Sequence, residues 1–216
     1  MYQTIRSDTR WFVPKDGSLN RERILDAAEK LVIENGYAAT SLDHVLRAAG
    51  TSKGAFFHHF GSKLDLARAL TDRYVTADIT NLDAALDATA DVADPAARVV
   101  AFVRHFEDRA DEIMSGQSSC LYVAVLTERQ LADAGTADLI NTAITAWRKG
   151  IADLLTEAAT AGGLELEDVD ALADHVFVTF EGAFLLCRST GSPAHMRAQL
   201  GVLRRLLAAA LGVAAA

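Results

Sequence analysis

The chain has 216 residues, half of them apolar, so it can bury a sizeable hydrophobic core. Its net charge of −8 excludes a uniformly basic surface, but residues 1–74 carry 11 Lys and Arg against 9 Asp and Glu, whereas residues 75–216 carry 10 against 20. No run approaches the roughly 20 apolar residues of a membrane span and the N-terminus lacks a signal-like apolar region, so we expect a cytoplasmic protein without a membrane partner.

The first 18 residues contain Pro14 and Gly17 and show no sustained hydrophobic period, which is typical of a flexible arm. The arm also carries basic side chains that could lie along a DNA minor groove. A disordered extension without a partner is the alternative. The sequence leaves the role of residues 1–18 open.

Three helices are predicted next. Apolar residues recur at helical spacing over 24–35 and again over 42–49. Gly50 can adopt the left-handed backbone conformation that ends a helix without steric cost, so we expect the chain to reverse there. Ser52 is well placed to cap the N-terminus of a third, shorter helix over 53–60. This spacing is that of a helix-turn-helix motif.

The third helix has one face for the core and one for a partner. At least two of Phe56, Phe57 and Phe60 should be buried, while Lys53 and His59 should point outward. A helix this short is not stable alone in water, so it must pack against its neighbours. Its outer face and N-terminus then stay accessible, and a helix N-terminus favours phosphate groups. The motif therefore indicates DNA binding.

One long stretch carries a specific resemblance to a known family, namely RERILDAAEKLVIENGYAATSLDHVLRAAGTSKGAFFHHFGSKLDL. Over residues 19–70 the chain resembles the DNA-binding domain of the TetR family of transcriptional regulators, above all in Lys-Gly-x-x-x-His-His-Phe and in the Gly-Ser-Lys that follows. The resemblance implies a DNA-binding domain over 19–74 with double-stranded operator DNA as its partner. It also implies a homodimer that reads two half-sites about 34–36 Å apart, or at a longer spacing.

Several residues of this domain are candidates for DNA contact. Lys53 and Lys63 each begin a helix, where the ammonium group and the helix dipole together favour phosphate. Thr40 is expected to cap the second helix, and the resemblance adds a phosphate contact there. His58 and His59 diverge by about 100° around a helix, so they are expected to contact DNA rather than share a metal ion. The candidate DNA-binding residues are Thr40, Ser41, Ser52, Lys53, Gly54, Ala55, Phe57, His58, His59 and Lys63.

Everything after the motif reads as helical, with no strand-like alternation. Asp94 and Pro95 begin one helix, and Gly162-Gly163 and Gly191 end others. The predicted segments are 62–88, 94–115, 118–133, 136–161, 167–190 and 193–211. We therefore predict an all-α fold of about nine helices, in which residues 75–216 form a larger ligand-binding and dimerisation domain.

The last two segments carry apolar residues over more than one face, so each needs to be covered on two sides. One side would pack on the subunit's own core. The resemblance implies that the other packs on the same helix pair of a second subunit, and a monomer with well-buried terminal helices is the alternative. The candidate interface residues are Phe184, Arg188, Met196, Leu200, Leu203 and Leu207.

The resemblance also implies a cavity for a small-molecule effector, although each candidate lining residue could be ordinary core. His105, Tyr122 and His175 are favoured because their polar tips would need partners if buried. The candidate ligand-binding residues are Phe102, His105, Phe106, Cys120, Tyr122, Trp147, His175, Phe177 and Phe180. Cys120 and Cys187 are isolated in the sequence, so we expect two buried thiols, with a redox-sensing pair as the alternative.

These observations predict a ligand-responsive transcriptional regulator, most simply a repressor that a small apolar or aromatic molecule releases from its operator. A transcriptional activator, a ligand-independent DNA-binding protein of the same fold and an architectural protein are the alternatives. An enzyme is less favoured, because the sequence has no paired-carboxylate metal motif, nucleophile elbow or phosphate loop. We accordingly expect no cofactor, no metal site and no catalytic residue.

Overall fold

The computed structural model describes residues 17–116, 120–131 and 135–215, and all regular secondary structure in those ranges is helical. The helices are α1 (Gly17–Asn35), α2 (Leu42–Ala48), α3 (Lys53–His59), α4 (Lys63–Ala88), α5 (Pro95–Asp108), α6 (Ala110–Gly116), α7 (Leu121–Leu126), α8 (Arg129–Leu131), α9 (Ala137–Gly162), α10 (Val169–Thr190) and α11 (Ala194–Ala210). Each of the predicted segments 94–115 and 118–133 forms two helices in the structure. If each of these two pairs is counted as one helix, the described residues contain nine helices, which is the predicted number. The predicted all-α fold is confirmed, while the predicted arm lies outside the described residues except for its last two positions.

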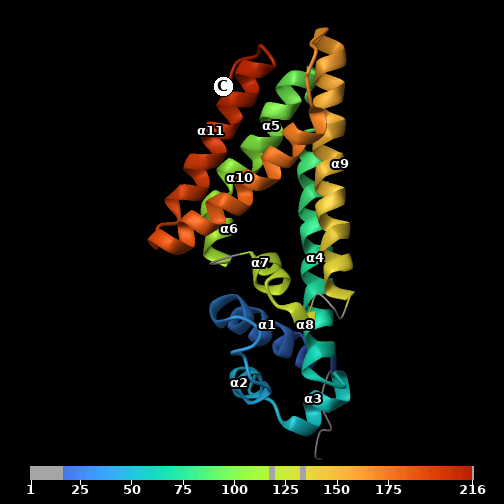
Figure 1. Cartoon of the computed structure of the whole chain (residues 1–216), viewed down its shortest axis with the longest axis vertical. Coiled ribbons are helices and arrows are strands. Elements are labelled where there is room, and N and C mark those ends of the chain that lie inside the picture. The colour runs from blue at the N-terminus through green and yellow to red at the C-terminus, as the bar shows by residue number, and fades with distance from the viewer. Residues whose placement is uncertain (1–16, 117–119, 132–134, 216) are drawn as a thin grey trace, which may run out of the picture.

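Helices α1 to α3 and the first turns of α4 form a small unit at one end of the molecule (Figure 1). Leu25 of α1, Val45 of α2 and Phe56 of α3 are almost completely buried in its core. Gly50 has a φ of 59°, which confirms the predicted reversal between α2 and α3. Ser52 caps α3 through its side-chain oxygen, also as predicted. The sequence therefore folds here into a helix-turn-helix.

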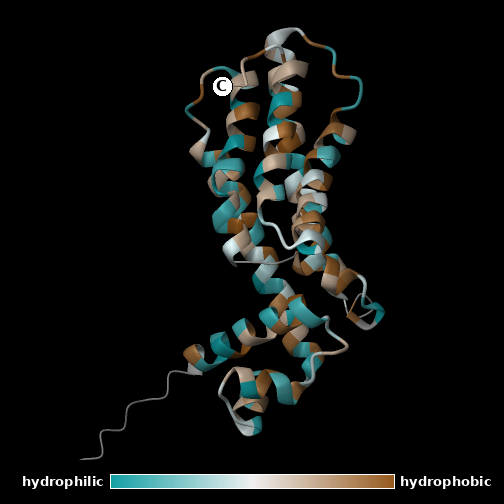
Figure 2. Ribbon diagram, turned by 90° about the vertical axis from the view of Figure 1, so that its left-hand side faces the viewer, coloured by the Kyte–Doolittle hydropathy of each residue, from teal (hydrophilic) through white to brown (hydrophobic). Residues whose placement is uncertain are grey.

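The larger part of the molecule is a helical bundle. Helices α4 and α9 run side by side, α5 and α10 pack on α9, and α11 packs on α5 and α10 (Figure 1). Hydrophobic and hydrophilic residues alternate around these helices in Figure 2, as expected of amphipathic helices that share a core. Phe102, Trp147, Leu155 and Leu200 belong to that core.

Two features join the small unit to the bundle. Helix α4 is unbroken, so the domain boundary expected after residue 74 falls in the middle of a helix. The core of the small unit also continues into α7, where Leu121, Tyr122 and Val125 are buried against α1 and α4. A displacement of α4 or α7 in the bundle must therefore move the small unit as well.

Polar contacts support this junction at two places. The Arg188 guanidinium donates hydrogen bonds to the backbone carbonyl oxygens of Ile33 (2.7 Å) and Glu34 (3.3 Å), at the C-terminal end of α1. A cation at this end of a helix also meets the negative end of the helix dipole. On the other side, the Glu128 carboxylate accepts a hydrogen bond of 3.1 Å from the backbone N–H of Ala38. Arg188 was predicted at the dimer interface, but in the structure it connects α10 to α1.

Replacing Arg188 with alanine should lower the free energy of unfolding by about 1–2 kcal/mol, because two charge-assisted hydrogen bonds to α1 are lost. Urea unfolding followed by circular dichroism measures this change. The matched control is Arg205→Ala on the exposed surface of α11, which should change stability by no more than about 0.5 kcal/mol. Equal losses in the two variants would mean that the bonds to α1 contribute nothing.

The predicted dimer contacts on α11 need a correction. Met196, Leu200, Leu203 and Leu207 are at most 2% exposed and lie in the core of their own bundle. Their assignment to a partner-facing surface was wrong, because the most regular apolar stripe of α11 is the one that packs on α5. The exposed apolar side chains of α10 and α11 form a different stripe, which consists of Val178, Leu185, Leu186, Val202 and Leu206.

Candidate functional site

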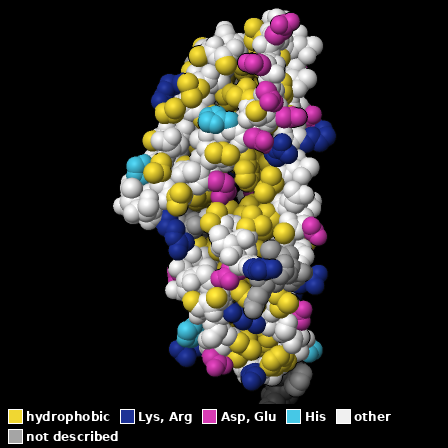
Figure 3. All heavy atoms as spheres, viewed as in Figure 1, with side chains coloured by type: hydrophobic (Ala, Val, Ile, Leu, Met, Phe, Trp, Pro, Cys, Tyr) yellow, Lys and Arg dark blue, Asp and Glu magenta, His cyan; other side chains and the backbone are white. Residues whose placement is uncertain are grey.

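The outer surface of α2 and α3 carries most of the residues predicted to contact DNA. Phe56 and Phe60 are buried whereas Phe57 is 48% exposed, which confirms that two of the three rings face the core. Figure 3 shows Lys, Arg and His side chains around this end of the molecule. The predicted residues that are exposed or half-buried here are Ser41, Ser52, Lys53, Gly54, Ala55, Phe57, His58, His59 and Lys63. Their contacts with DNA stay a prediction.

Thr40 does not share this surface. Its side chain is buried, and its hydroxyl lies within hydrogen-bond distance of the carbonyl oxygens of Leu31 (3.1 Å) and Gly36 (2.8 Å). The N-terminus of α2 is capped instead by Ser41, whose hydroxyl accepts a hydrogen bond from the backbone N–H of His44. The predicted role of Thr40 as that cap was therefore wrong. Its hydroxyl satisfies the C-terminal end of α1 rather than facing a phosphate.

Lys63 is half-buried at the start of α4. Its ammonium donates a hydrogen bond of 2.6 Å to the backbone carbonyl of Tyr37 and lies 3.9 Å from the centre of the Tyr37 ring. Burial lowers the pKa of Lys63, and the nearby Glu128 carboxylate opposes that shift. Lys63 therefore holds the loop between α1 and α2 in place. The position of Lys63 in the sequence motif did not reveal this role.

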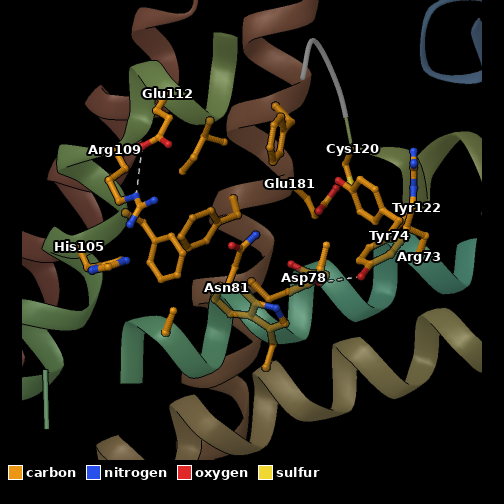
Figure 4. Close-up of a pocket in the computed structure, with 18 of the residues that line it drawn as sticks. Arg73, Tyr74, Asp78, Asn81, His105, Arg109, Glu112, Cys120, Tyr122 and Glu181 are labelled. Atoms are coloured by element: carbon orange, nitrogen blue, oxygen red, sulfur yellow. Dashed lines mark hydrogen bonds and ion pairs between the residues drawn. The ribbon is translucent and has the colours of Figure 1, made fainter. Parts of the chain in front are cut away.

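A cavity of about 410 Å³ opens in the bundle among α4, α5, α6, α7, α9 and α10 (Figure 4). Its apolar wall is a cluster of rings: the centre of Phe106 lies 5.3 Å from that of Trp147 and 5.3 Å from that of Phe180. On the face seen in Figure 3, hydrophobic side chains surround this region with acidic groups among them. The volume is that of a small-molecule site.

Polar groups gather at the end of the cavity nearest α7 (Figure 4). The Tyr122 hydroxyl donates a hydrogen bond of 2.6 Å to the Asp78 carboxylate, and the Tyr74 hydroxyl lies 3.9 Å from the sulfur of Cys120. Burial raises the pKa of Asp78, and the bond from Tyr122 opposes this. Burial also raises the pKa of Glu181, whose carboxylate projects into the same region from α10. The cavity therefore combines an aromatic wall with an acidic end.

Most of the predicted ligand-binding residues do line this cavity, but two do not. Phe102 is buried in the bundle core behind Phe106 and Trp147, and His175 is exposed. His175 does not line the cavity because the lining stripe of α10 runs through Phe177. Two residues along a helix correspond to about 200° of rotation, so His175 lies on nearly the opposite side of α10. The predicted residues that do line the cavity are His105, Phe106, Cys120, Tyr122, Trp147, Phe177 and Phe180. Phe184, predicted at the dimer interface, lines it as well.

Sequence reasoning missed the contribution of α4. Tyr74, Asp78 and Asn81 line the cavity at intervals of four and three residues, and this spacing would have placed them on one helical face. The candidate lining residues chosen from the sequence were aromatic, histidine and cysteine side chains from Phe102 onward, so the polar stripe of α4 was not among them. Glu181 was missed for the same reason, although it stands between Phe180 and Phe184 on the lining face of α10.

The remaining expectations concern cysteine, metal and membrane chemistry. Cys120 and Cys187 are buried and form no disulfide, and burial raises the pKa of the Cys120 thiol, which disfavours the reactive thiolate. Within the described ranges, no group of three or more His, Cys, Asp and Glu side chains is placed to hold a metal ion. In those same ranges, none of the helices has the length and hydropathy needed to cross a membrane.

Comparison with known proteins assigns both parts of the chain. Residues 24–70 match the family described as bacterial regulatory proteins, tetR family, and residues 95–199 match the C-terminal domain of LmrA/YxaF-like transcriptional regulators. The chain is 33% identical over 175 residues to the transcriptional regulator AcuR of Cereibacter sphaeroides, an alignment that covers 79% of this chain and 77% of AcuR. It is 41% identical over 51 residues to the transcriptional repressor AcnR of Corynebacterium glutamicum, covering 24% and 27% of the two chains. A relative named as an activator also matches part of the chain.

A solved structure agrees with this assignment. The crystal structure of a regulatory protein TetR from Rhodobacter sphaeroides superposes with a TM-score of 0.70 at 29% identity, covering 87% of this chain and 98% of that one. The helix-turn-helix, the helical bundle and the relatives therefore agree, and they describe a DNA-binding regulator rather than an enzyme. The chain belongs to the TetR family of transcriptional regulators.

Proposed function

We propose that this protein is a cytoplasmic repressor that binds operator DNA as a homodimer and is released by a small molecule in the cavity described above. The observation that carries the proposal is the course of α4. This helix begins with Lys63 beside the predicted DNA-binding surface and continues without a break to Tyr74, Asp78 and Asn81 in the cavity wall. A ligand that repositions these side chains therefore acts on a rigid connection to the DNA-binding unit.

For DNA, we propose that α3 enters the major groove. Lys53 and Gly54 stand exposed at its N-terminal end, and Phe57 is exposed on its outer side. Helix-turn-helix proteins contact base edges through residues near the start of their second helix, while other residues contact phosphates. We assign Lys53 to a phosphate, and Gly54 and Phe57 to base edges. The acidic excess of residues 75–216 lies in the bundle, so repulsion of DNA by those carboxylates favours approach through α2 and α3.

For the dimer, we propose the exposed apolar stripe of α10 and α11 as the contact surface. Leu185 and Leu206 are 68% and 57% exposed, and the two helices pack against each other. Gly182 stands in the same stripe with open space around its Cα, which would permit close approach of a second backbone. Several large apolar side chains exposed together on two adjacent helices are typical of a surface that a partner covers.

For the response to ligand, we propose that an occupied cavity fixes one position of α4 relative to α7 and α10. In a dimer, this position sets the distance between the two copies of α3. A distance that differs from the half-site spacing of the operator lowers the affinity for DNA, typically by 5–150-fold for about 1–3 kcal/mol of coupling. The junction through Glu128 and Arg188 would carry the same displacement to α1.

The test begins with an operator selected from random-sequence duplexes by the purified protein. Compounds of all charge classes are then screened for an increase in melting temperature, and those that bind are added to the complex with DNA. We expect at least one compound to release the operator. Ala77→Phe, which places a ring in the cavity from α4, should abolish this release.

The matched control is Ala161→Phe on the exposed surface of α9, which should respond to the compound as the unmodified protein does. Release that persists in Ala77→Phe would show that the cavity is not the effector site. A compound that strengthens the complex with DNA would overturn ligand release, and a screen in which no compound binds would remove the ligand response.

A further inference from the structure

The acidic end of the cavity is formed by two carboxylates from facing helices, Asp78 on α4 and Glu181 on α10 (Figure 4). One oxygen of Asp78 accepts the hydrogen bond from Tyr122. In contrast, Oε2 of Glu181 is buried and accepts no hydrogen bond from the described residues; the Cys120 thiol lies close enough to oppose the rise in the pKa of Glu181, but without the geometry of a hydrogen bond to this oxygen. A buried carboxylate oxygen without a hydrogen-bond partner is costly, so a ligand that brings a donor to this oxygen would be stabilised there.

The positive side chains that line the cavity are committed to other carboxylates. Arg73 donates to Glu29 at 2.6 Å and also to Glu22 and Asp26 on α1. The guanidinium of Arg109 lies 3.3 Å from the carboxylate of Glu112, toward the opposite end of the cavity (Figure 4).

His105 adds no fixed positive charge, because burial and the neighbouring Arg109 lower its pKa. None of these three lining residues therefore neutralises Asp78 or Glu181.

The aromatic wall beside these carboxylates suits the same kind of partner. The indole N–H of Trp147 lies near Asp78, close enough to oppose the rise in its pKa but without the geometry of a hydrogen bond. The ring centres of Trp147, Phe106 and Phe180 lie within 6 Å of one another, and the rings are tilted or edge-to-face rather than stacked. Aromatic faces attract cations electrostatically, and they do so more strongly where water is excluded.

We propose that the effector carries a protonated amine that pairs with Glu181, and an aromatic or alkyl body that packs on Phe106, Trp147 and Phe180. This inference rests on the proposed ligand response and names the chemical class of the ligand. An ammonium group supplies the missing donor to Oε2 and offsets one of the two carboxylate charges. A neutral alcohol of equal size supplies a donor without the charge, and a carboxylate would meet two groups of its own sign.

The test uses three probes with one skeleton: 4-phenylbutylamine, 4-phenyl-1-butanol and 4-phenylbutyrate. The protein is the full chain with Trp11→Phe, so that Trp147 is its single tryptophan and its fluorescence reports the cavity. Melting temperature provides a second readout that does not depend on fluorescence. We expect the amine to bind at least tenfold more tightly than the alcohol, and the carboxylate to bind most weakly.

Glu181→Gln keeps the shape of the side chain and removes its charge, so it should reduce the affinity for the amine by about tenfold or more. The affinity for the alcohol should change by less than threefold. Glu165→Gln removes an exposed carboxylate after α9 and serves as the control for net charge; it should change neither affinity.

Each other outcome has a distinct meaning. Equal binding of amine and alcohol, or an amine preference that survives Glu181→Gln, overturns the inference while leaving the cavity as an effector site. Tighter binding of 4-phenylbutyrate would show that the carboxyl groups are protonated and donate to an anion. No response to the amine up to millimolar concentration also overturns the inference, whereas the proposed ligand response fails only if compounds of every charge class fail to bind.

Discussion

Leu206→Glu should give a folded monomer that no longer binds operator DNA with measurable affinity. Leu206 is 57% exposed on α11, so a glutamate there meets water in an isolated subunit and costs little. In the proposed dimer the same carboxylate would be buried without a partner, at a cost of several kcal/mol. The dissociation constant of the dimer should therefore rise by at least about 100-fold, since each 1.4 kcal/mol is a factor of ten. Sedimentation velocity measures the subunit mass, and circular dichroism confirms the helix content.

Leu203→Glu is the matched control, because it makes the same change about one turn away on α11, at a residue of the buried stripe. Leu203 is 2% exposed in the bundle core, so this variant should unfold, or melt at least about 10 °C lower, before dimerisation is affected. A Leu206→Glu protein that sediments as a dimer would refute the proposed surface. An unmodified protein that is monomeric at micromolar concentration would refute the dimer itself.

Lys53→Ala should weaken operator binding by about tenfold or more and reduce the magnitude of the salt slope by nearly two per dimer, since one phosphate contact is lost in each half-site. Its side chain is exposed and makes no hydrogen bond within the described structure. The melting temperature should therefore stay unchanged. Binding titrations at several salt concentrations, on operator and on unrelated DNA, separate this contact from base recognition: a phosphate contact affects both DNAs alike.

Lys63→Ala is the informative counterpart. It should also reduce the salt slope if Lys63 reaches phosphate, but it additionally removes the hydrogen bond to Tyr37 and the contact with its ring, at a cost of about 1 kcal/mol. A lowered melting temperature with an unchanged salt slope would mean that Lys63 only supports the loop between α1 and α2. An unchanged slope in Lys53→Ala would show that α3 does not approach DNA through this residue.

The sequence by itself determined the local structure of the DNA-binding unit. Each of its elements is specified by nearby residues: Gly50 takes the left-handed conformation, Ser52 caps α3, and Phe56 and Phe60 turn inward because the helix is short and amphipathic. The all-helical class followed in the same way from hydrophobic periodicity and from the Gly and Pro residues that end helices. Signals of this kind act within about four residues, so no knowledge of distant contacts is needed to read them.

Only the tertiary structure decided which surfaces of the helices became core, cavity or exposed stripe. Leu203 and Leu206 are the same residue type in the sequence, and only the packing of α11 on α5 and α10 buries one and leaves the other exposed. Asp78 and Glu181 are 103 positions apart in the chain, and they face one cavity only because α4 and α10 both pack against α9. Periodicity shows that a helix has an apolar face, but the partner of that face is set by long-range packing. For this reason the acidic end of the cavity was visible only in the folded chain.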